Sequence, residues 1–290
     1  TCIVMKNFYV ITNAVKDEKL ILTEKIRAYI EKKGGNCGYQ VSVAPGRGNC
    51  PLSLKQIPED TECILVIGGD GTLIRAARDT VALKLPLVGV NHGNLGYLCE
   101  LEEDNVYDAI DRMFVNDYVL EHRMMLSGYV VKGGTKSGET VALNDIVIHR
   151  SGALQIVNLV VYVNGEYLSE FMADGIIAAT ATGSTAYNMS AGGPIVDPQA
   201  NLILITPINS HTLNSKSIVL SADDEIEIEI GQRRSEKDEK VEVSFDGDDA
   251  VHLEVGDRIV IHRAKTNTQI LKLSRISFLE TLRKKMHTYA

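Results

Sequence analysis

The first third of the chain alternates between short apolar runs and longer amphipathic ones. Apolar residues recur at helical spacing in three segments, which predicts helices over residues 16–33, 72–81 and 104–114. Four short runs bounded by polar or glycine residues predict strands at 6–13, 39–44, 63–69 and 85–91. Because strands that alternate with helices favour parallel pairing, we expect an open α/β parallel sheet with helices on both faces.

The pattern changes after about Asn116, where helical periodicity gives way to short segments of alternating apolar and polar residues. Asn164-Gly165 lies between two alternating segments, which is the strongest short signal for a β-hairpin. We therefore expect antiparallel sheets packed as a β-sandwich, and then a helix over 278–286 that packs back on the first domain. The expected domains are an α/β domain of residues 1–117 with about 270–290, and a β-rich domain of residues 118–269.

Composition and charge narrow the function classes. The 290 residues are 44% hydrophobic and 23% charged, which is ordinary for a globular protein with a sizeable core. The net charge of −8 argues against a protein that binds duplex nucleic acid through a basic face. It leaves phosphate-containing ligands open, because backbone amides can bind phosphate without any net positive charge.

Cysteine usage and hydropathy suggest the compartment. The five cysteines, from Cys2 to Cys99, form no CxxC pair, so neither a zinc framework nor a disulfide scaffold is indicated. No run approaches the roughly 20 apolar residues of a membrane span. The N-terminus lacks a cationic start followed by a long apolar run, so no signal peptide is indicated. We expect free thiols and a cytoplasmic protein without a membrane partner.

A lone acid between glycines is the first candidate for chemistry. The apolar run that begins at Cys63 stops at Gly68-Gly69 and is followed by Asp70, Gly71 and Thr72. Glycines permit a tight turn with outward amides, and Thr72 can cap the helix that follows, so the turn can bind phosphate. A carboxylate beside phosphate is explained if Asp70 accepts a proton or binds Mg²⁺. The simpler alternative is that Asp70 only caps the turn; the P-loop and Rossmann fingerprints are absent.

A second candidate region runs from Ala173 to Pro198 and is dense in hydroxyl groups. Groups in its TGSTA turn can bind the edge of a base, and Tyr187 can stack on an aromatic ring. Equally, the hydroxyls can satisfy their own backbone, and the residues alone leave both interpretations open. The neighbouring pair Asn144-Asp145 suits the paired hydroxyls of a ribose, or is a polar pair at the edge of a strand.

Taken together, these motifs resemble the ATP-NAD kinase family. The resemblance is carried by GGDGT, NHGNLGYL, EHRMML, LNDIVIHR and DGIIAATATGSTAYNMSAGGPIV, which begin at Gly68, Asn91, Glu121, Leu143 and Asp174. GGDGT alone is weak, because lipid kinases and phosphofructokinases carry similar strings, whereas the long run that contains TGSTAY is far more specific. The motifs stand in family order over most of the chain.

The resemblance implies that the γ-phosphate of ATP is transferred, with Mg²⁺ or another divalent cation, to the 2′-hydroxyl of the adenosine ribose of NAD. It implies that Asp70 is the proton acceptor, and that Gly71 and Arg75 lie near the dinucleotide. The implied ribose ligands are Asn144 and Asp145. The implied adenine site comprises Thr182, Thr185, Ala186, the stacking Tyr187 and the nearby Ser190.

The resemblance also implies a homo-oligomer, commonly a tetramer, because Asp174 matches an acid that reaches a dinucleotide bound largely by a neighbouring subunit. Three positions depart from the family pattern. Asp145 stands where Glu is common, Lys216-Ser217 stands where Arg-Pro is common, and Asp248 stands where Gln is frequent. The last two receive no role. A kinase of the GGDGT type with a lipid or sugar acceptor and a non-catalytic dinucleotide sensor are the alternatives.

Overall fold

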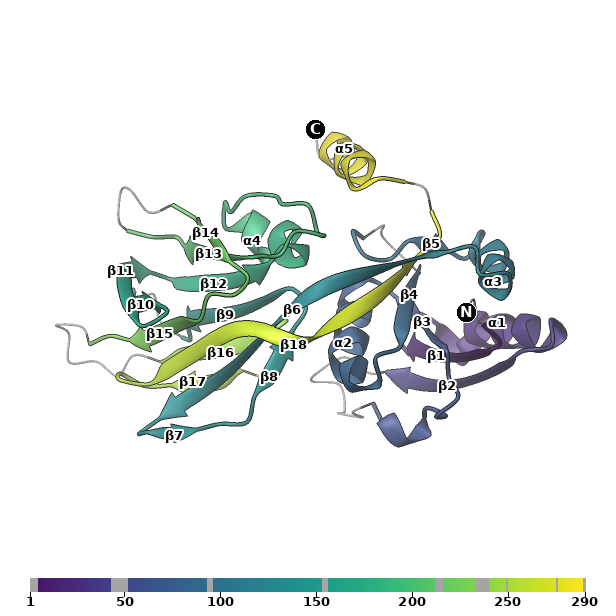
Figure 1. Cartoon of the computed structure of the whole chain (residues 1–290), viewed down its shortest axis with the longest axis horizontal. Coiled ribbons are helices and arrows are strands. Elements are labelled where there is room, and N and C mark those ends of the chain that lie inside the picture. Colours follow the sequence, from purple (N-terminus) through teal and green to yellow (C-terminus); the bar gives the residue numbers. More distant parts are fainter. Residues whose placement is uncertain are drawn as a thin grey trace. The chain divides into compact units, whose positions relative to one another are not determined.

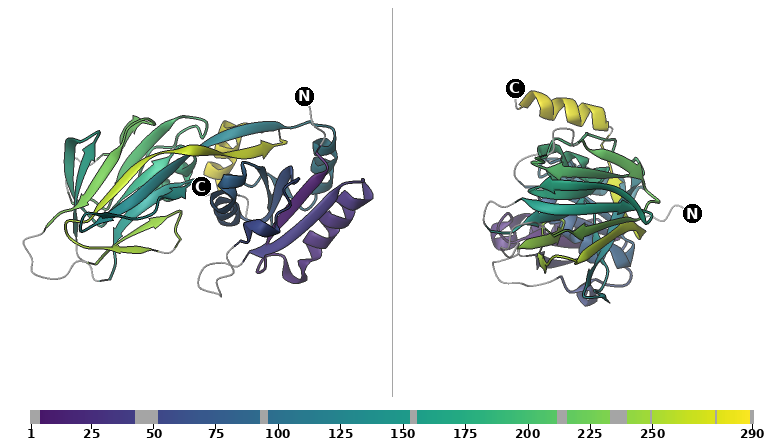
Figure 2. Two further views of the ribbon diagram at one scale, coloured as in Figure 1. Left: turned by 60° about the horizontal axis from the view of Figure 1, so that its bottom comes forward. Right: turned by 90° about the vertical axis from the view of Figure 1, so that its left-hand side faces the viewer.

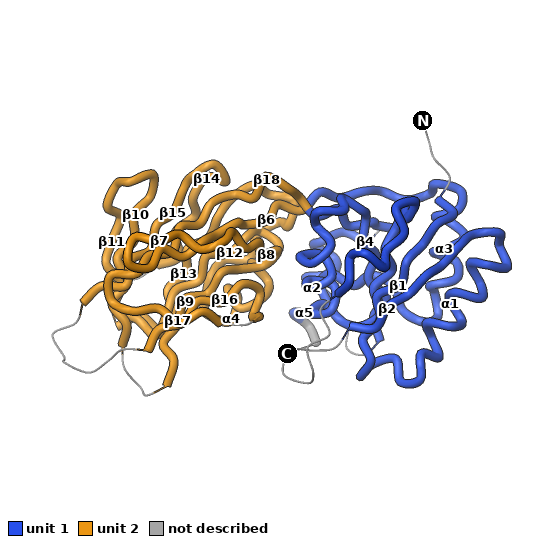
Figure 3. The backbone as a smooth tube through the Cα atoms, turned by 90° about the horizontal axis from the view of Figure 1, so that it is seen from below, with its two compact units in different colours: residues 1–122, 268–290 blue, residues 123–267 orange. Residues whose placement is uncertain are grey.

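The structure is a computed structural model of the 290-residue chain. It describes residues 5–42, 52–92, 96–152, 156–211, 216–232, 240–248, 250–274 and 276–288. Two compact units are distinguished, the first of residues 1–122 with 268–290 and the second of residues 123–267 (Figure 3). Two long strands, β6 (Val119–Lys132) and β18 (Arg258–Lys272), contribute residues to both units.

The first unit is built on a parallel sheet (Figure 1). Its strands in spatial order are β2 (Asn36–Ser42), β1 (Asn7–Asn13), β3 (Cys63–Gly68) and β4 (Pro86–Asn91). The short β5 (Leu101–Glu102) and the end of β18 also pair with β4 in parallel. Because all these strands run the same way, their carboxyl ends meet at one edge, where open α/β sheets bind ligands.

Helices cover both faces of this sheet, as the alternation of strands and helices predicts (Figure 2). Helices α1 (Ile21–Lys32) and α3 (Val106–Phe114) pack on one face, and α2 (Asp70–Thr80) packs against β3 and β4. The chain also forms short 3₁₀ segments η1 (Glu18–Leu20), η2 (Leu54–Gln56) and η3 (Val81–Leu83), and a terminal helix α5 (Phe278–Thr288). The described part of α5 contacts this unit, since the Lys285 ammonium lies 4.5 Å from the centre of the Tyr97 ring.

The start of the first helix differs from the one that the sequence predicts. The first helix was expected from Lys16, but α1 begins at Ile21, because Lys19 and Leu20 adopt left-handed backbone angles (φ 58° and 59°). The buried Asp17 explains this kink. Its carboxylate accepts hydrogen bonds from the amides of Leu22 (2.9 Å) and Thr23 (2.9 Å), so a residue that precedes the helix satisfies the free amides of its first turn.

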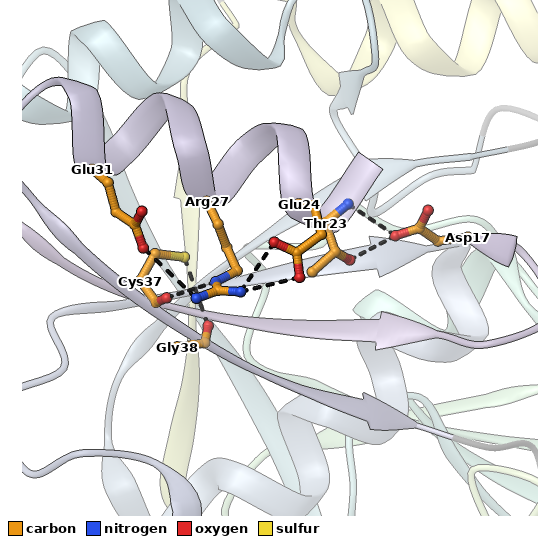
Figure 4. Close-up of polar contacts among 7 residues, drawn as sticks. All are labelled: Asp17, Thr23, Glu24, Arg27, Glu31, Cys37 and Gly38. Carbon is orange, nitrogen blue, oxygen red and sulfur yellow. Dashed lines mark hydrogen bonds and ion pairs between the residues drawn. The ribbon is translucent and has the colours of Figure 1, made fainter. Parts of the chain in front are cut away.

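Helix α1 is fixed to β2 by one arginine (Figure 4). Arg27 donates from Nε to the Cys37 carbonyl (3.0 Å), and its guanidinium lies 3.1 Å from both carboxylate oxygens of Glu24. The same guanidinium lies 5.0 Å from the centre of the Tyr39 ring. Burial raises the pKa of the Cys37 thiol to about 12, so this cysteine packs as a small apolar residue.

The second unit consists of antiparallel sheets, which confirms the expected β-rich class. One sheet has the order β14 (Ile218–Ser221), β13 (Leu202–Ile208), β12 (Gly175–Thr180), β9 (Asp145–Arg150), β16 (Val241–Phe245) and β17 (Val251–Leu253). The other contains β11 (Glu166–Ala173), β10 (Val157–Val163), β15 (Ile226–Ile230) and β18, with β6, β7 (Thr135–Lys136) and β8 (Thr140–Ala142).

The hairpin that Asn164-Gly165 predicts is present between β10 and β11. Val163 pairs with Glu166, and the two turn residues take positive φ values of 52° and 79°. Both central residues at positive φ match the turn whose twist suits an antiparallel pair.

Strands β9, β12 and β13 are apolar on both faces, because both are covered. Ile146, Ile176 and Ile203 belong to the core between the two sheets. Val147, Ile177 and Leu204 face outward and pack under the segment that contains Ala191 and Val196. This covering segment carries η4 (Thr182–Thr185) and α4 (Tyr187–Ser190), so the hydroxyl-rich run forms helical turns laid on the sheet.

In the part of the chain that the structure describes, no helix combines the length and the apolar character needed to cross a membrane.

The Asp17 contacts predict a pH-dependent contribution to stability. Burial alone would raise the pKa of Asp17, but hydrogen bonds from Thr23, Leu22 and Thr12 outweigh it and hold that pKa below its ordinary value. We expect Asp17→Asn to lower the free energy of unfolding at pH 7 by about 1–3 kcal/mol, measured by urea denaturation. The loss should be full above the unfolded pKa of about 3.9 and should shrink as pH falls through the lower folded value.

Exposed Asp60→Asn is the matched control and should leave the urea midpoint unchanged at every pH. Equal midpoints for Asp17→Asn and the wild-type protein at pH 7 would contradict this account of the helix start.

Candidate functional site

Asp70 lies where β3 passes into α2, with Gly69 as the N-cap residue. Its carboxylate accepts hydrogen bonds from three consecutive backbone amides: Tyr97 (2.5 Å), Leu98 (3.2 Å to each oxygen) and Cys99 (3.0 Å). Both oxygens are therefore engaged, and the side chain is fixed against the segment that follows β4.

Gly96 is required by this contact. A Cβ atom at residue 96 would lie 1.8 Å from Oδ1 of Asp70, so no side chain fits there while the carboxylate keeps its place. The described residues of NHGNLGYL, 91, 92 and 96–98, lie at the same sheet edge as Asp70, since the amides of Tyr97 and Leu98 bind its carboxylate. Gly93, Asn94 and Leu95 lie outside the described residues.

The glycines of GGDGT act differently from the expectation. Gly68, Gly69 and Gly71 are not among the residues with positive φ, so the turn does not depend on left-handed backbone. Gly68 is needed for space instead, because a Cβ there would lie 2.5 Å from Oγ1 of Thr72. Thr72 does not cap the helix: α2 begins at Asp70, and the Thr72 hydroxyl accepts a hydrogen bond from Nδ2 of Asn13 (3.1 Å).

Arg75 lies one turn further along α2 and is partly buried, on the same unit as Asp70. The carboxyl ends of β1 and β4 also border an open pocket of about 330 Å³. His92, directly after β4, lines this pocket. The other lining residues are Val15, Lys16, Asp17, Glu18, Ile21, Leu22 and Glu103.

The segment that holds Asp70 is anchored at its other end by Glu100. This carboxylate accepts the amides of Leu273 (2.8 Å) and Ser274 and pairs with the ammonium of Lys272 (2.7 Å). The side chain of Glu100 is only 6% exposed. Residues 97–100 are thus held between Asp70 and the chain that leaves β18, so the position of Asp70 depends on both ends of this unit.

In the second unit, Asn144 and Asp145 meet the hydroxyl-rich turn. Both were expected within one strand, but β9 begins at Asp145, and Asn144 belongs to the bend before it. Asp145 pairs with Ala179 of β12, and the Thr180 amide donates to the Asn144 carbonyl (2.8 Å). Gly183 packs on the same carbonyl, because a Cβ at residue 183 would lie 2.1 Å from it.

The hydroxyls of this turn divide between the two interpretations. Thr180 donates to the Leu143 carbonyl (2.6 Å), and Thr185 donates to the Thr182 carbonyl (3.4 Å), so both satisfy nearby backbone. Oγ1 of Thr182 and Oδ1 of Asn144 are buried and find no hydrogen-bond partner among the described residues. Since buried polar atoms in native proteins are normally paired, these two atoms are the ones available to a ligand.

Tyr187 is the first residue of α4. Ala186 is the residue before α4, and Tyr187 is 45% exposed, as an aromatic ring that stacks on a ligand must be. Beneath it, the fully buried Asn188 donates to the carbonyls of Ser184 (3.2 Å) and Pro194 (3.0 Å). Ser190 ends the helix and is exposed.

Asp145 is 5% exposed and lies close to the carboxylate of Asp246. Burial, reinforced by the charge of Asp246, raises the pKa of Asp145 to about 7. Asp246 itself accepts the amides of Leu143 (2.7 Å), Asn144 (2.7 Å) and Asp145 (3.1 Å). Asp246 is a functional candidate that the sequence motifs do not single out; the Asp-Gly pair after an alternating strand is the one signal that marks it as a turn acid.

Asp174 lies apart from the other candidates of this unit. It follows β11 and precedes β12, whereas Asn144, Asp145 and Thr182 gather at the opposite ends of β9 and β12. Hydrogen bonds from Asn209 and Arg150 lower the pKa of Asp174. Nε of Arg150 lies 2.9 Å from its Oδ1.

The predicted residues thus form two groups, one in each unit, and Asp174 stands alone. The first contains Gly68, Gly69, Asp70, Gly71, Thr72 and Arg75. The second contains Asn144, Asp145, Thr182, Thr185, Ala186, Tyr187 and Ser190. Among the described residues, no three His, Cys, Asp or Glu side chains gather closely enough to hold a metal ion by themselves.

Comparison with known proteins gives a consistent result. The family model for the ATP-NAD kinase N-terminal domain matches residues 50–118, and the model for the ATP-NAD kinase C-terminal domain matches residues 143–273. The NAD kinase of Agathobacter rectalis is 58% identical over 286 residues, covering 99% of this chain and 100% of the relative. The NAD kinase of Lachnospira eligens is 43% identical over 293 residues, covering 97% and 100%.

Two solved structures share the fold. Yeast NADH kinase complexed with NADH superposes with a TM-score of 0.83 at 23% identity, covering 98% of this chain and 88% of the other. An NAD kinase from Archaeoglobus fulgidus in complex with ATP superposes with a TM-score of 0.74 at 21% identity, covering 97% and 98%.

The contact between Gly183 and Asn144 predicts the effect of one added methyl group. In Gly183→Ala, the new Cβ meets the carbonyl and Cα of Asn144, which are backbone atoms that cannot swing away. We expect a loss of about 1–3 kcal/mol or more in the free energy of unfolding, measured by urea denaturation.

Gly138→Ala is the matched control, because a Cβ there meets nothing within 4 Å, and it should leave the urea midpoint within error of the wild-type value. A Gly183→Ala variant as stable as this control would show that the turn does not pack on Asn144.

Proposed function

Because the chain belongs to the ATP-NAD kinase family, we propose that it transfers the γ-phosphate of ATP to the 2′-hydroxyl of the adenosine ribose of NAD and so makes NADP. The single observation that carries this proposal is the full-length likeness to a curated NAD kinase at 58% identity. The geometry supports it independently, since unpaired buried polar atoms lie beside a carboxyl group in one unit and an amide-bound acid stands at the sheet edge of the other.

We assign recognition of the dinucleotide mainly to residues 118–269. Asn144 and Asp145 hold the ribose hydroxyls, which supplies a partner for the buried Oδ1 of Asn144. The adenine lies against the η4–α4 turn, where the Thr182 hydroxyl donates or accepts at the base edge. Thr185 and Ala186 line this turn, Tyr187 stacks on the ring, and Ser190 adds a polar contact.

We assign phosphate transfer to residues 1–117 with about 270–290. The first amides of α2 and the turn formed by Gly68, Gly69 and Gly71 face a bound phosphate and take up part of its charge, and Arg75 lies near the dinucleotide. Mg²⁺ enters as part of the substrate MgATP. This mode fits the chain, because Mg²⁺ is commonly held by one or two carboxylates together with substrate phosphates, and no larger set is needed.

In the proposed reaction, Asp70 accepts the proton of the ribose 2′-hydroxyl. The O–H bond breaks as the oxygen bonds to the γ-phosphorus, and the bond from this phosphorus to the leaving ADP oxygen breaks. Because three amides already engage the Asp70 carboxylate, one of these contacts must give way to the hydroxyl. The remaining amides keep the carboxylate aligned, so it retains its orientation when one contact is exchanged.

We further propose that the enzyme is a homo-oligomer, a dimer or tetramer, that works in the cytoplasm. The isolated position of Asp174 supports the first point, since this acid lies at the other end of the strands from its own Asn144-Asp145 pair, where a neighbouring subunit's ligand could reach it in exchange for Arg150 and Asn209. The second point is supported by Cys37, Cys63 and Cys99, which are free buried thiols.

The direct test is purified protein with ATP, Mg²⁺ and NAD, assayed for NADP with a coupled dehydrogenase. Parallel reactions replace NAD with NADH, ATP with polyphosphate, and NAD with diacylglycerol, which separates NAD kinase from a lipid kinase of the same type. We expect Asp70→Asn to lower kcat by about 10²–10⁴-fold, because general base catalysis is lost. NAD affinity should stay within about tenfold, roughly 1.4 kcal/mol.

Asp79→Asn, near the end of the same helix, is the matched control and should retain the wild-type kcat. Near-normal turnover by Asp70→Asn would remove Asp70 as the proton acceptor, and a wild-type protein that binds NAD without making NADP would favour the sensor.

Exposure of Tyr187 predicts a separate effect on binding. Tyr187→Ala removes the ring and should raise the KM for NAD by about 5–100-fold, since base–aromatic stacking contributes about 1–3 kcal/mol. Tyr187→Phe keeps the ring and should keep the KM within about twofold of the wild-type value. The same KM for the alanine variant and the wild-type enzyme would place Tyr187 outside the site.

A further inference from the structure

We propose that Asp246 is a positioning residue for nucleotide recognition: its carboxylate fixes the Asn144-Asp145 pair through the backbone and stands as a second acid beside the buried side chain of Asp145. This inference rests on the proposed function for what the pair binds. The Asp246 cradle, by which we mean the hydrogen bonds from its carboxylate to the amides of residues 143–145, does not depend on the proposed function.

The Asp246 side chain binds the backbone of residues 143–145. The Asp246 carboxylate accepts three consecutive amides, with Oδ2 bound to Leu143 (2.7 Å) and Oδ1 bound to Asn144 (2.7 Å) and Asp145 (3.1 Å). The backbone closes the same loop in the other direction, since the Asp246 amide donates to the Asp145 carbonyl (2.9 Å). Four hydrogen bonds therefore join one residue to a three-residue bend.

Asp246 has a left-handed backbone (φ 52°), and Gly247 after it also has positive φ (72°). Asp and Asn tolerate this region better than most residues, whereas alanine is strained there. The turn directly follows β16, whose Phe245 pairs with Ile146 of β9. Strand pairing thus delivers the carboxylate to the bend, and the left-handed turn aims it at the three amides.

The hydrogen bonds from Asp246 position the side chain of Asn144 and the turn that carries Thr182. The bend carries Oδ1 of Asn144, which is buried without a partner among the described residues. The Asn144 carbonyl accepts the Thr180 amide and supports Gly183, so the bend also sets the turn that carries Thr182. Loss of the cradle would therefore displace the ribose ligands and the turn together.

The side chain of Asp145 is 5% exposed, and among the described residues no group donates a hydrogen bond to its carboxyl group. The elements packed on this end of β9 contribute Ala179 from β12 and the acid of the Asp246 turn, with Asp248 two residues further on. The other charged groups of these strands, His149, Arg150 and Glu242, lie at the far end of β9.

An acid that is buried beside a second, amide-stabilised acid ionises reluctantly. Burial, with the charge of Asp246 as the second cause, raises the pKa of Asp145 to about 7. In its neutral form Asp145 can donate a hydrogen bond to a ribose oxygen, and in its charged form it can only accept one. The affinity for the ribose therefore changes as Asp145 loses its proton with rising pH.

The test compares Asp246→Asn with the wild-type protein. Asparagine tolerates the left-handed backbone and is nearly isosteric, but it lacks the charge and puts an NH₂ group where Oδ2 accepts the Leu143 amide. The titration of the Asp145 carboxyl group is followed by ¹³C NMR in ligand-free protein, and Asp145→Asn identifies its signal. We expect a wild-type midpoint near pH 7 and a midpoint lower by about one unit in Asp246→Asn, because burial remains.

Kinetics provide the second measurement. The KM for NAD between pH 5.5 and 8.5 should bend near the Asp145 midpoint in the wild-type enzyme and bend at lower pH in Asp246→Asn, with KM raised about tenfold and kcat changed less than about threefold. Asp246→Glu keeps the charge, so its bend should stay near that of the wild-type enzyme. Asp224→Asn, which replaces a carboxylate that accepts the Ser221 amide in a turn of the same unit, is the control and should change neither bend nor KM.

An Asp246→Asn variant that is less stable but keeps the wild-type Asp145 midpoint and KM profile would overturn the proposal and leave Asp246 a purely structural residue. A wild-type Asp145 midpoint near its ordinary value of about 3.9 would overturn it too. A wild-type protein that makes no NADP would instead sink the proposed function, while the NMR titration would still decide the role of Asp246.

Discussion

A carboxylate that accepts hydrogen bonds from a run of backbone amides is the interaction on which each of the two groups of candidate residues depends. Asp70 accepts hydrogen bonds from the amides of residues 97–99, and Asp246 accepts them from the amides of residues 143–145. Glu100 does the same for the chain that leaves β18. Irregular segments must satisfy their own amides, and a bond to a charged acceptor contributes about 1.5–3 kcal/mol. One acid therefore orders a whole bend that no ladder or helix would hold.

The same interaction explains how a chain of net charge −8 can place acids in a site for phosphates. Amides around Asp70 spread part of its charge over neutral donors, so the repulsion of a nearby phosphate is reduced. Asp145 shows the opposite case. It is deeply buried without donors from the described residues and next to the charge of Asp246, and its pKa rises to about 7. Two aspartates thus acquire different chemistry from the number of amides around them.

The sequence predicts the regular parts of this protein well, because periodicity reports burial directly. The parallel strands, the antiparallel strands, the Asn164-Gly165 hairpin and the GGDGT turn at the end of a strand all follow from local patterns. The amide cradles do not, because a contact from Asp246 to a backbone 101–103 residues away leaves no mark in either segment. The role of Thr72 was missed for the same reason, because its partner Asn13 lies 59 residues away. The late start of α1 has a local cause, since Asp17 lies only five residues before Leu22.

Asp145 and Asp174 lie toward opposite ends of β12, and the distance between them decides whether one ribose can contact both acids. Asp145 pairs with Ala179 of β12, and Asp174 lies five residues before Ala179. At about 3.3 Å per residue, this separation is about 16 Å, and β12 between them is buried throughout. No backbone adjustment short of unfolding the sheet can bring the two acids to one ribose. Asp174 is instead paired with Arg150 and Asn209 at the surface, where exchange of these partners for a ligand's hydroxyls costs little. A role for Asp174 in nucleotide binding would therefore involve a ligand group other than the ribose proposed to lie at Asn144 and Asp145.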